Sequence, residues 1–327
     1  MTRKGINPYK LIKGGSLNNS QITICVITHV PFIGGYWRES FDVLKVSLES
    51  MIVNTQSNVD IFVFDNGSCE SVTLYLSELL AQGKINFLLL SDRNIGKCAA
   101  WNMLFGAVQT EFILYSDSDV YFYPGWENAH LEIFDNFDKV GMVTGLPIRD
   151  NVNVYTSSTF EAIEKSNDIS ITRGKLIPFI YLERIRASVG ATTDIYLNGE
   201  LKNLLDVRID KKEISAYVGA GHFEFMIRSK IARELLPFPT SKLIGNESII
   251  DNLINTKKYL RLSTCNAVVH HIGNSLENDK WWKELNSNSL VPTNLKKSIG
   301  SRNIIGKILR KISISFYDEI NRKFPPT

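Results

Sequence analysis

Short apolar runs alternate with helix-like segments along the first part of the chain. The apolar runs cover residues 22–27, 61–64, 85–90 and 112–115, and helical periodicity occupies the stretches between them, the last over 96–108. The helical stripes of the first two stretches consist of Phe41, Leu44, Leu48, Met51 and Ile52, and of Leu74, Leu76, Leu79 and Leu80. Strands that are almost continuously apolar and are separated by helices form βαβ units. The pattern therefore predicts a doubly wound α/β sheet that is buried on both faces.

The composition is that of an ordinary globular protein, with 44% hydrophobic and 22% charged residues among 327. No apolar run reaches the length of about eighteen residues that a transmembrane helix needs. Residues 1–20 are basic and polar without an apolar core, so we interpret them as an extension and not as a secretory signal. The four cysteines show neither metal-ligand spacing nor a disulfide framework, which favours a reducing, cytoplasmic environment.

Two carboxylates end the run at residues 112–115. Asp117 and Asp119 lie two residues apart, so they share one face of an extended chain, and a slight turn lets both reach one cation. Such hard oxygen ligands suit Mg²⁺ or Mn²⁺, particularly where substrate phosphates fill the remaining coordination positions. An Asp-rich turn explains the tripeptide equally well.

Two further motifs end neighbouring predicted strands. Asp65-Asn66-Gly67-Ser68 offers a carboxylate and an amide that could hydrogen-bond the edge of a planar base. In residues 94–97, Gly96 allows close backbone approach, while the helix N-terminus and Lys97 favour an anion. Each motif alone also fits a turn or a helix cap. Because the three motifs end successive strands, they converge on the sheet edge at which open α/β folds bind ligands.

The order of these motifs resembles that of family 2 inverting glycosyltransferases, which have the GT-A fold. It comprises Thr28-His29, residues 65–68, Arg-Asn-Ile-Gly-Lys at 93–97 with Asn102 behind it, and Asp-Ser-Asp at 117–119. Downstream, residues 219–228 resemble the acceptor-side segment of the family, and residues 266–275, with His270-His271, resemble its closing strand. The resemblance covers residues 20–276 and is weakest over 151–215.

The resemblance implies a Rossmann-like doubly wound mixed sheet, a nucleotide-diphosphate sugar donor that is typically a UDP-sugar, and a Mg²⁺ or Mn²⁺ cofactor. It implies that Asp65 binds the nucleobase, that Asp117 contacts the ribose or the metal shell, and that Asp119 holds the ion. The other donor-binding positions that it implies are Thr28, Asn94, Gly96, Lys97 and Asn102. The closing strand would supply a third metal ligand, for which we select His271 over His270; a packed or exposed histidine is the plainer alternative.

The chain departs from the family pattern at the expected catalytic base. Family members carry Glu-Asp before the helix that precedes the last strand, and the Asp deprotonates the acceptor hydroxyl. Counting back from residues 258–259 places Asn246-Glu247 at this position, so Glu247 would replace the Asp. Asp251, one helical turn later on the same side, is the alternative base. A carboxylate that merely begins a helix also explains Glu247.

Two other histidines have weaker assignments. His222, in the acceptor-side segment, is a minor candidate for contact with substrate, and His130, on a helix predicted over 127–137, is expected at the surface.

We divide the chain into a basic extension (1–20), a catalytic domain (21–276) and a lid with a C-terminal helical tail (277–327). Within the catalytic domain, residues 21–147 form the nucleotide-sugar half and residues 148–276 the acceptor half, with an acceptor-side insertion at 151–215.

The tail carries an excess of positive charge. Residues 296–327 contain eight Lys or Arg against Asp318 and Glu319, a net charge of +6, whereas the whole chain has +3. An apolar helical face bordered by lysines and arginines is typical of an element on an anionic membrane surface, here the inner face. Docking of that face on the catalytic domain explains the pattern equally well. A nucleic-acid role is disfavoured because aromatics are not interleaved with the basic residues.

The sequence thus predicts a metal-dependent inverting glycosyltransferase that acts on a hydroxyl of a glycan, a lipid-linked or another acceptor. The alternative is a catalytically silent relative that binds a sugar nucleotide or serves as a partner subunit, because Asn246-Glu247 is atypical. Sugar nucleotidyltransferases are disfavoured because no Gly-rich loop follows the first strand, and dinucleotide enzymes because G-x-G-x-x-G is absent. Processive polysaccharide synthases are disfavoured because the chain lacks membrane spans and a Gln-x-x-Arg-Trp motif.

Overall fold

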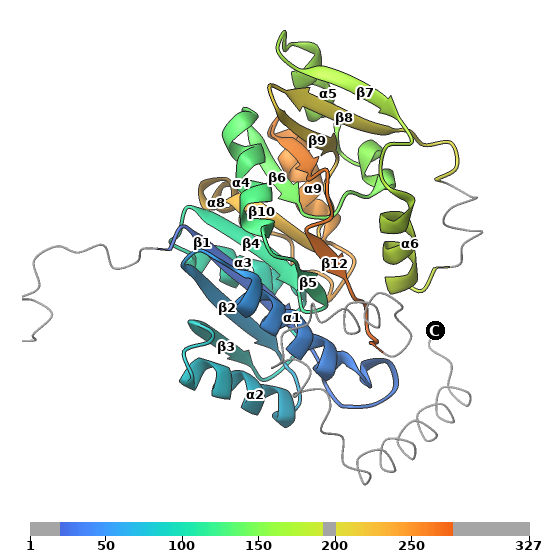
Figure 1. Ribbon diagram of the computed structural model, residues 1–327. Helices are drawn as coiled ribbons and strands as arrows, with labels where there is room; N and C mark the ends of the chain where they lie inside the picture. The colour runs from blue at the N-terminus through green and yellow to red at the C-terminus, as the bar shows by residue number, and fades with distance from the viewer. Residues whose placement is uncertain (1–19, 192–200, 277–327) are drawn as a thin grey trace, which may run out of the picture.

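A computed structural model describes residues 20–191 and 201–276 of the chain. Ten of the described strands form one mixed sheet in the order β3-β2-β1-β4-β10-β6-β11-β9-β8-β7, and helices cover both of its faces (Figure 1). The predicted fold class, a doubly wound mixed α/β sheet with an insertion on the acceptor side, is confirmed. The predicted C-terminal helical tail and the lid lie outside the described residues, as does most of the basic extension.

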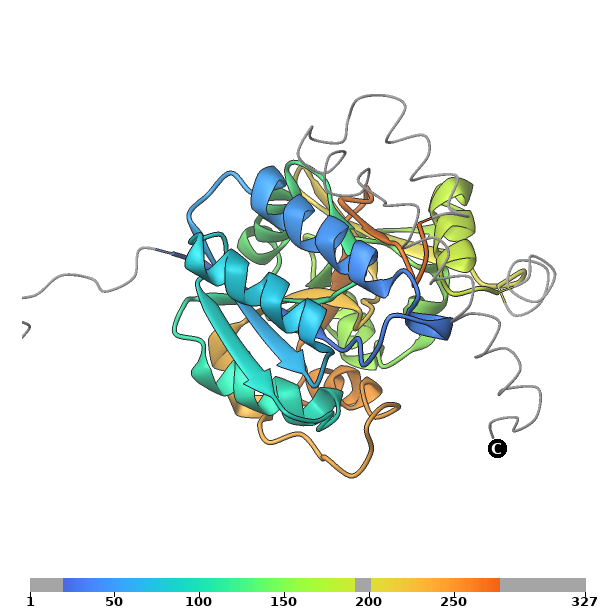
Figure 2. The same ribbon diagram turned by 90° about the horizontal axis from the view of Figure 1, so that it is seen from below.

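The first four strands are parallel and follow the predicted alternation. They are β1 (Ile22–Thr28), β2 (Val59–Asn66), β3 (Phe87–Ser91) and β4 (Phe112–Asp117), joined by α1 (Ser40–Asn54), α2 (Glu70–Ala81) and α3 (Lys97–Ala107). Alternate side chains of β1 point to opposite faces, so Ile24 packs in the core with α1 and α2, whereas Cys25 packs with α3. Figure 2 shows α1 and α2 on one side of these strands and α3 on the other.

The edge of the sheet departs from the prediction of burial on both faces. Phe87 and Leu90 of β3 are 50% and 52% exposed, and Leu74 of α2 is 58% exposed. An edge strand has a neighbour on one side only, so the helix above it can cover it only in part. Leu76 and Leu79 form the buried stripe of α2 together with Val72.

The rest of the described chain completes the sheet and adds a small second one. The elements are η2 (Gly35–Trp37), β5 (Val120–Phe122), α4 (Trp126–Asn136), β6 (Val140–Thr144), η3 (Arg149–Asn153), α5 (Ser157–Glu164), β7 (Ser170–Gly174), α6 (Phe179–Ser188), β8 (Asp206–Lys211), β9 (Ile214–Val218), β10 (Glu224–Arg228), α8 (Ser229–Leu235), α9 (Ser248–Thr256), β11 (Leu260–Ser263) and β12 (Val269–His271).

Strand β10 decides where the acceptor-side segment lies. It is inserted antiparallel between β4 and β6, with Glu224 opposite Ser116, so the residues just before β10 lie beside the Asp pair at the end of β4. One continuous sheet therefore runs through both predicted halves of the catalytic domain, and the boundary at residue 147 stays a prediction.

A buried ion pair joins η3 to strand β8 of the insertion. Arg149 Nε lies 2.7 Å from Asp206 Oδ1, and Arg149 Nη2 lies 3.1 Å from Asp206 Oδ2. The same carboxylate accepts the backbone N–H groups of Leu176 and Ile177 at 2.7 and 2.8 Å. Bidentate charged hydrogen bonds of this kind define geometry tightly, so the segment that leads into α6 has a definite position.

The expectation that His130 lies at the surface is wrong. The side chain is fully buried, with Nδ1 at 2.7 Å from the Trp126 carbonyl and Nε2 at 2.8 Å from Glu224 Oε1. Glu224 also accepts the N–H of Gly145 at 2.7 Å. The partner that makes burial of this histidine favourable lies 94 residues away, so helical periodicity gave no sign of it.

No helix in the described ranges combines the length and the apolar character that crossing a membrane requires.

Candidate active site

Three predicted site residues meet at the carboxyl ends of neighbouring strands. Thr28 is the register partner of Asp65 on β2, and Ile27 is the register partner of Asp117 on β4. Parallel pairing of β1 with both neighbours thus places Thr28, Asp65 and Asp117 along one edge of the sheet, as predicted.

Asp65 is buried with one oxygen unsatisfied. Its Oδ1 accepts the N–H of Ser68 at 3.1 Å, while Oδ2 has no hydrogen-bond partner in the described part of the chain. The Thr28 hydroxyl beside it is equally buried and equally lacks a described partner. Burial raises the pKa of Asp65 above its usual value, and the hydrogen bonds from Ser68 and the nearby His29 oppose this rise. Buried polar atoms without partners are rare in proteins, so this pair points to a ligand that supplies the missing hydrogen bonds.

Asn66 is occupied by the protein itself and does not face a base. Its Nδ2 donates to Asn94 Oδ1 at 3.0 Å, and its Oδ1 accepts the N–H of Ile95 at 2.8 Å. Gly67 next to it has φ +82°, and a Cβ there would lie 2.6 Å from the backbone of Arg93. The predicted base-edge role of the amide is therefore wrong, because Asn66 holds the loop before α3 against β2.

Gly96 lies close against the loop at residues 242–243. The N–H of Gly96 donates to Asn94 Oδ1 at 2.9 Å, and the N–H of Lys97 donates to the Leu243 carbonyl at 3.1 Å. A Cβ at Gly96, where φ is +86°, would lie 2.9 Å from the Lys242 carbonyl oxygen. These two N–H groups at the start of α3 are thus used within the protein, while the donor-binding roles of Asn94 and Gly96 stay predictions.

Asn102 is likewise hydrogen-bonded to the protein backbone. Its Nδ2 donates to the Phe238 carbonyl at 3.0 Å, and its Oδ1 accepts the N–H of Phe238 at 2.7 Å. Since both ends of the amide are engaged with one backbone unit, Asn102 ties α3 to the segment after α8. Its donor-binding role stays a prediction.

Lys97 and Asp117 form an ion pair at the centre of the site. Lys97 Nζ lies 2.8 Å from Asp117 Oδ1 and 2.9 Å from Oδ2. The hydroxyl of Tyr115 donates to the same carboxylate, and the N–H of Asp117 donates to the Phe223 carbonyl at 2.8 Å. Asp117 is therefore fixed from three directions, and one of them brings a positive charge to the strand end.

Asp119 faces His271 across the turn between β4 and β5. His271 Nε2 lies 3.5 Å from Asp119 Oδ2. Ser188 Oγ donates to the Ile185 carbonyl at 2.8 Å, so at 2.8 Å from His271 Nδ1 it acts as the acceptor. This fixes the proton on Nδ1 and, in the neutral imidazole, leaves the Nε2 lone pair directed at the carboxylate. Burial raises the pKa of Asp119, and the positive charge that the neighbouring His271 carries when it is protonated opposes the rise.

Asp119 and His271 fit a divalent cation as two ligands. The carboxylate oxygen of Asp119 and the lone pair of neutral His271 Nε2 face each other, and a cation bound between them would remove their mutual repulsion. Carboxylate and imidazole are both suitable ligands for Mn²⁺. No group of three or more His, Cys, Asp or Glu side chains among the described residues is arranged to hold a metal. Asp117, the third predicted ligand, is engaged by Lys97 in this structure. Substrate oxygens and water would have to complete the coordination, as is usual for Mg²⁺ sites.

The two candidate bases lie in different environments. Glu247, the N-cap residue of α9, is 8% exposed; its Oε2 accepts the N–H of Gly245 at 2.8 Å, and its Oε1 has no described partner. Asp251 is 2% exposed, with Oδ1 at 2.9 Å from Arg261 Nη2 and Oδ2 at 3.1 Å from His222 Nδ1. Asp251 is thus ion-paired with Arg261, although its Oδ1 makes no hydrogen bond among the described residues, whereas Oε1 of Glu247 has neither kind of partner there, so the geometry favours Glu247.

Several residues that support the site were not among the sequence-based predictions. Tyr115 directly precedes the Asp pair, and its position next to Asp117 is a signal that could have been used. Ser188 and Arg261 had no comparable signal, because their partners lie 83 and 10 residues away on other elements.

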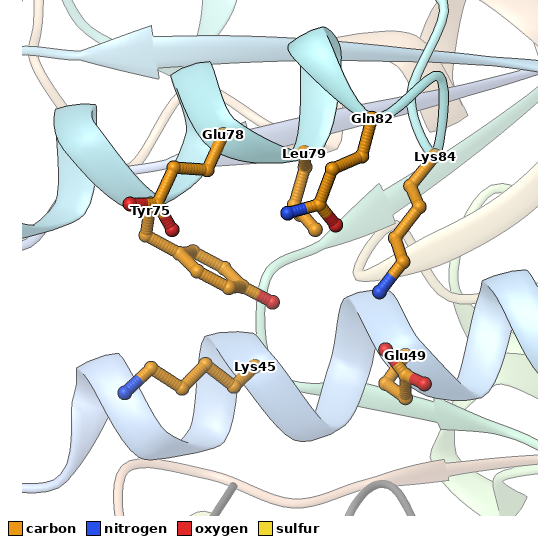
Figure 3. A pocket seen from close by; sticks show the side chains of 7 residues that line it. All are labelled: Lys45, Glu49, Tyr75, Glu78, Leu79, Gln82 and Lys84. Carbon is orange, nitrogen blue, oxygen red and sulfur yellow. The ribbon is translucent and has the colours of Figure 1, made fainter.

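A separate hollow lies between α1 and α2, away from these strand ends (Figure 3). Lys45, Glu49, Tyr75, Glu78, Leu79, Gln82 and Lys84 line it. Its charged side chains carry both signs, and it contains none of the predicted site residues.

The comparisons with known proteins agree with the order of the motifs. Residues 36–186 match the family model "Glycosyl transferase family 2". A curated relative, an uncharacterized glycosyltransferase of Nostoc sp., is 26% identical over 128 residues, which make up 39% of this chain and 40% of the relative. The chain thus spans less than half the length of the curated relative that it matches.

Solved structures with a similar arrangement of elements have low sequence identity. S. aureus TarS, residues 1–349, has 13% identity and a TM-score of 0.43, covering 77% of this chain and 60% of that one. GalNAc-T7, solved with UDP, GalNAc and Mn²⁺, has 15% identity and a TM-score of 0.46, covering 77% and 43%. The family match and the motifs at the ends of β1, β2 and β4 thus agree in making residues 36–186 similar to glycosyl transferase family 2.

Proposed function

We propose that the protein transfers a sugar from a UDP-sugar to an acceptor hydroxyl, with inversion at the anomeric carbon and with a divalent metal ion. The observation that carries the proposal is the pair of buried, unsatisfied oxygens on Asp65 and Thr28. They lie on the same sheet edge as the Lys97–Asp117 ion pair, and the Asp119–His271 pair follows directly after β4. A carboxylate that could bind a base, a positively charged lysine and a cation site thus lie in sequence along this edge of the sheet.

The nucleotide would lie across the ends of β2, β1 and β4. Asp65 Oδ2 accepts the N3–H group of uracil, which supplies the hydrogen bond that this oxygen lacks. Asp117 contacts the ribose, and Lys97 places positive charge beside the diphosphate. The protein thereby recognises the base by hydrogen bonding and the phosphates by charge.

Asp119 and His271 would hold Mg²⁺ or Mn²⁺. When bound there, the ion neutralises charge on the departing diphosphate. Ser188 orients His271 through Nδ1, and the N–H of Ile272 fixes the turn by donating to the Asp119 carbonyl at 2.7 Å. These contacts hold the two ligand atoms in place before the donor arrives.

Glu247 would act on the acceptor. Its open Oε1 takes the proton of the acceptor hydroxyl as the oxygen attacks the anomeric carbon from the side opposite the diphosphate. The new C–O bond forms while the bond to the diphosphate oxygen breaks, and the electron pair leaves with UDP. The acceptor is a hydroxyl compound of the glycan or lipid-linked class.

A screen of nucleotide sugars tests the donor and the metal together. The full chain should release UDP from at least one UDP-sugar in Mn²⁺ or Mg²⁺, and excess chelator should abolish the release. Release that is insensitive to chelator contradicts the role of the metal. Tight UDP binding without turnover of any sugar over a broad acceptor panel favours the silent relative instead.

Replacement of Asp65 by Asn should weaken UDP binding and stabilise the protein. Since Oδ1 accepts the N–H of Ser68, the asparagine oxygen takes that place and its NH₂ group opposes the N3–H of uracil. We expect a loss of affinity of roughly 10- to 100-fold for free UDP and UDP-sugar alike, measured by calorimetry.

The stability effect of the same variant has a defined pH dependence. Burial raises the pKa of Asp65 in the folded state above the ordinary value of 3.8. Ionisation therefore opposes folding, and the penalty is absent below the ordinary pKa and fully present above the raised one. Asp65→Asn should raise the melting temperature at neutral pH, and the gain should shrink as pH falls through this range. A lower melting temperature at neutral pH, together with unchanged UDP affinity, contradicts the assignment.

A further inference from the structure

Three side chains in contact, those of Arg261, Asp251 and His222, lead from the protein interior to the acceptor-side segment. Arg261 on β11 is fully buried and lies 2.9 Å from Asp251 on α9, which is 2% exposed. Asp251 in turn lies 3.1 Å from Nδ1 of His222, whose side chain is 40% exposed. A buried ion pair therefore ends in a half-exposed imidazole on the loop between β9 and β10.

The interior end of this series of side chains is firmly anchored. Arg261 donates through Nη2 to the Ala220 carbonyl and through Nη1 to the carbonyls of Val154 and Tyr155. Because the guanidinium is planar and carries fixed donors, these contacts set the orientation of Asp251. Asp251 is thus a rigid hydrogen-bond acceptor for the imidazole.

This arrangement defines which nitrogen of His222 is open. An ionised Asp251 only accepts hydrogen bonds, so His222 Nδ1 carries the proton that points to it. In the neutral ring, the lone pair of Nε2 then points away from Asp251, and Nε2 has no hydrogen-bond partner in the described residues. His222 is therefore poised to accept a hydrogen bond from outside the protein.

The position of His222 links it to the candidate active site. The next residue, Phe223, accepts the N–H of Asp117, and its ring packs edge-on against His271 at 5.2 Å between centroids. On the other side, Asp251 lies one helical turn after Glu247, and residues four apart share a helix face. His222 is thus linked to His271 through the neighbouring Phe223 and to the helix that begins after Glu247 through Asp251.

We propose that His222 is an acceptor-binding residue, whose Nε2 accepts a hydrogen bond from a hydroxyl next to the one that Glu247 deprotonates. This inference rests on the proposed function and deepens it, because it specifies the class of acceptor. The acceptor carries at least two neighbouring hydroxyls, as a sugar ring does, and His222 selects it over a simple alcohol. Asp251 and Arg261 are positioning residues that act through the imidazole.

A thermodynamic cycle between the protein and the acceptor tests the inference. We would compare the parent, His222→Phe and His222→Gln on a methyl hexopyranoside that the parent glycosylates and on its monodeoxy analogues. His222→Phe keeps a ring of similar size and should lower kcat/KM for the full acceptor by about 5- to 50-fold, mainly through KM. His222→Gln should recover part of this loss, because its amide oxygen can replace Nε2 as acceptor.

One deoxy analogue identifies the contact. The analogue that lacks the bound hydroxyl should already be a poor acceptor for the parent, and His222→Phe should lower its kcat/KM no further. Metal-dependent hydrolysis of the donor in the absence of acceptor should be the same in parent and variants. If His222→Phe has an equal effect on all analogues, or an equal effect on donor hydrolysis, the inference is overturned.

A second measurement is independent of activity. The chain has five histidines, so ¹⁵N-labelled histidine gives a spectrum in which His222→Gln assigns the His222 ring by difference. The neutral His222 should carry its proton on Nδ1; a proton on Nε2 overturns the inference even if transfer is normal. Failure of the parent itself to transfer any sugar would instead overturn the proposed function, and with it the acceptor role, so the two failures are distinguishable.

Discussion

Replacement of Asp119 by Asn is expected to abolish metal-dependent sugar transfer while the fold stays intact. Asp119 is the carboxylate that faces His271 Nε2 at 3.5 Å, and an amide is a much weaker ligand for a hard cation. A bound metal ion contributes several kcal/mol to stabilisation of the leaving diphosphate, so the loss in turnover should be about a thousandfold or more. Release of UDP at saturating Mn²⁺ measures the effect.

Two comparisons make the Asp119 result specific. Calorimetry should show that Mn²⁺ strengthens UDP binding in the parent but not in Asp119→Asn. The matched control is Asp92→Asn, because Asp92 is also an aspartate in a loop that follows a strand but has a side chain 84% exposed. We expect parental activity and melting temperature for the control. Full activity of Asp119→Asn, or parental metal dependence of its UDP binding, refutes the metal assignment.

Replacement of Glu247 by Gln is expected to lower turnover strongly and to leave donor affinity nearly unchanged. A general base acts on the acceptor proton in the transition state, contributes roughly 10²- to 10⁴-fold and takes no part in binding of the donor. The amide oxygen of Gln can still accept the N–H of Gly245, so the N-cap geometry of α9 and the stability should be preserved. Steady-state kinetics with varied donor and saturating acceptor separate kcat from KM.

The controls for Glu247 distinguish a wrong residue from a wrong reaction. Glu132→Gln changes an exposed glutamate in helix α4 and should have no effect. If Asp251→Asn lowers turnover without loss of melting temperature while Glu247→Gln does not, the base is Asp251, and the alignment of residues 246–251 with the family motif is wrong. If neither lowers it, the proton goes to another group, and His222, which contacts Asp251, is the next residue to replace.

Much of the first half could be predicted from the sequence because its order is local. The runs at 22–27, 61–64 and 112–115 became the parallel strands β1, β2 and β4, and the stripe from Phe41 to Ile52 became α1. Strands β1, β2 and β3 pair across single βαβ units, and β4 pairs with β1 where the strand order switches, so hydrophobic periodicity and turn residues indicate the elements of this half. The convergence of Thr28, Asp65 and Asp117 on one edge followed from this order alone.

The roles of polar side chains in the same half were less predictable. The turn motif at residues 65–68 suggested a base-edge role for Asn66, and the family resemblance implied donor binding by Asn94 and Asn102; in the structure the amides of all three bind the protein. A polar side chain at a strand end or a helix start can bind a ligand or a nearby backbone group. The choice depends on which loop approaches it, and the loops at residues 238 and 242–243 come from distant parts of the chain.

The sequence by itself determined the alternation of strands and helices, the edge on which the chemistry lies and the identity of its central carboxylates. Only the tertiary structure decided the partners that give these groups their properties. Insertion of β10 beside β4, Ser188 behind His271, and Arg261 beneath Asp251 all join elements that are separate in sequence. Local patterns report periodicity and turn propensity, whereas burial, pKa and the direction of a lone pair depend on contacts that form only when distant segments pack together.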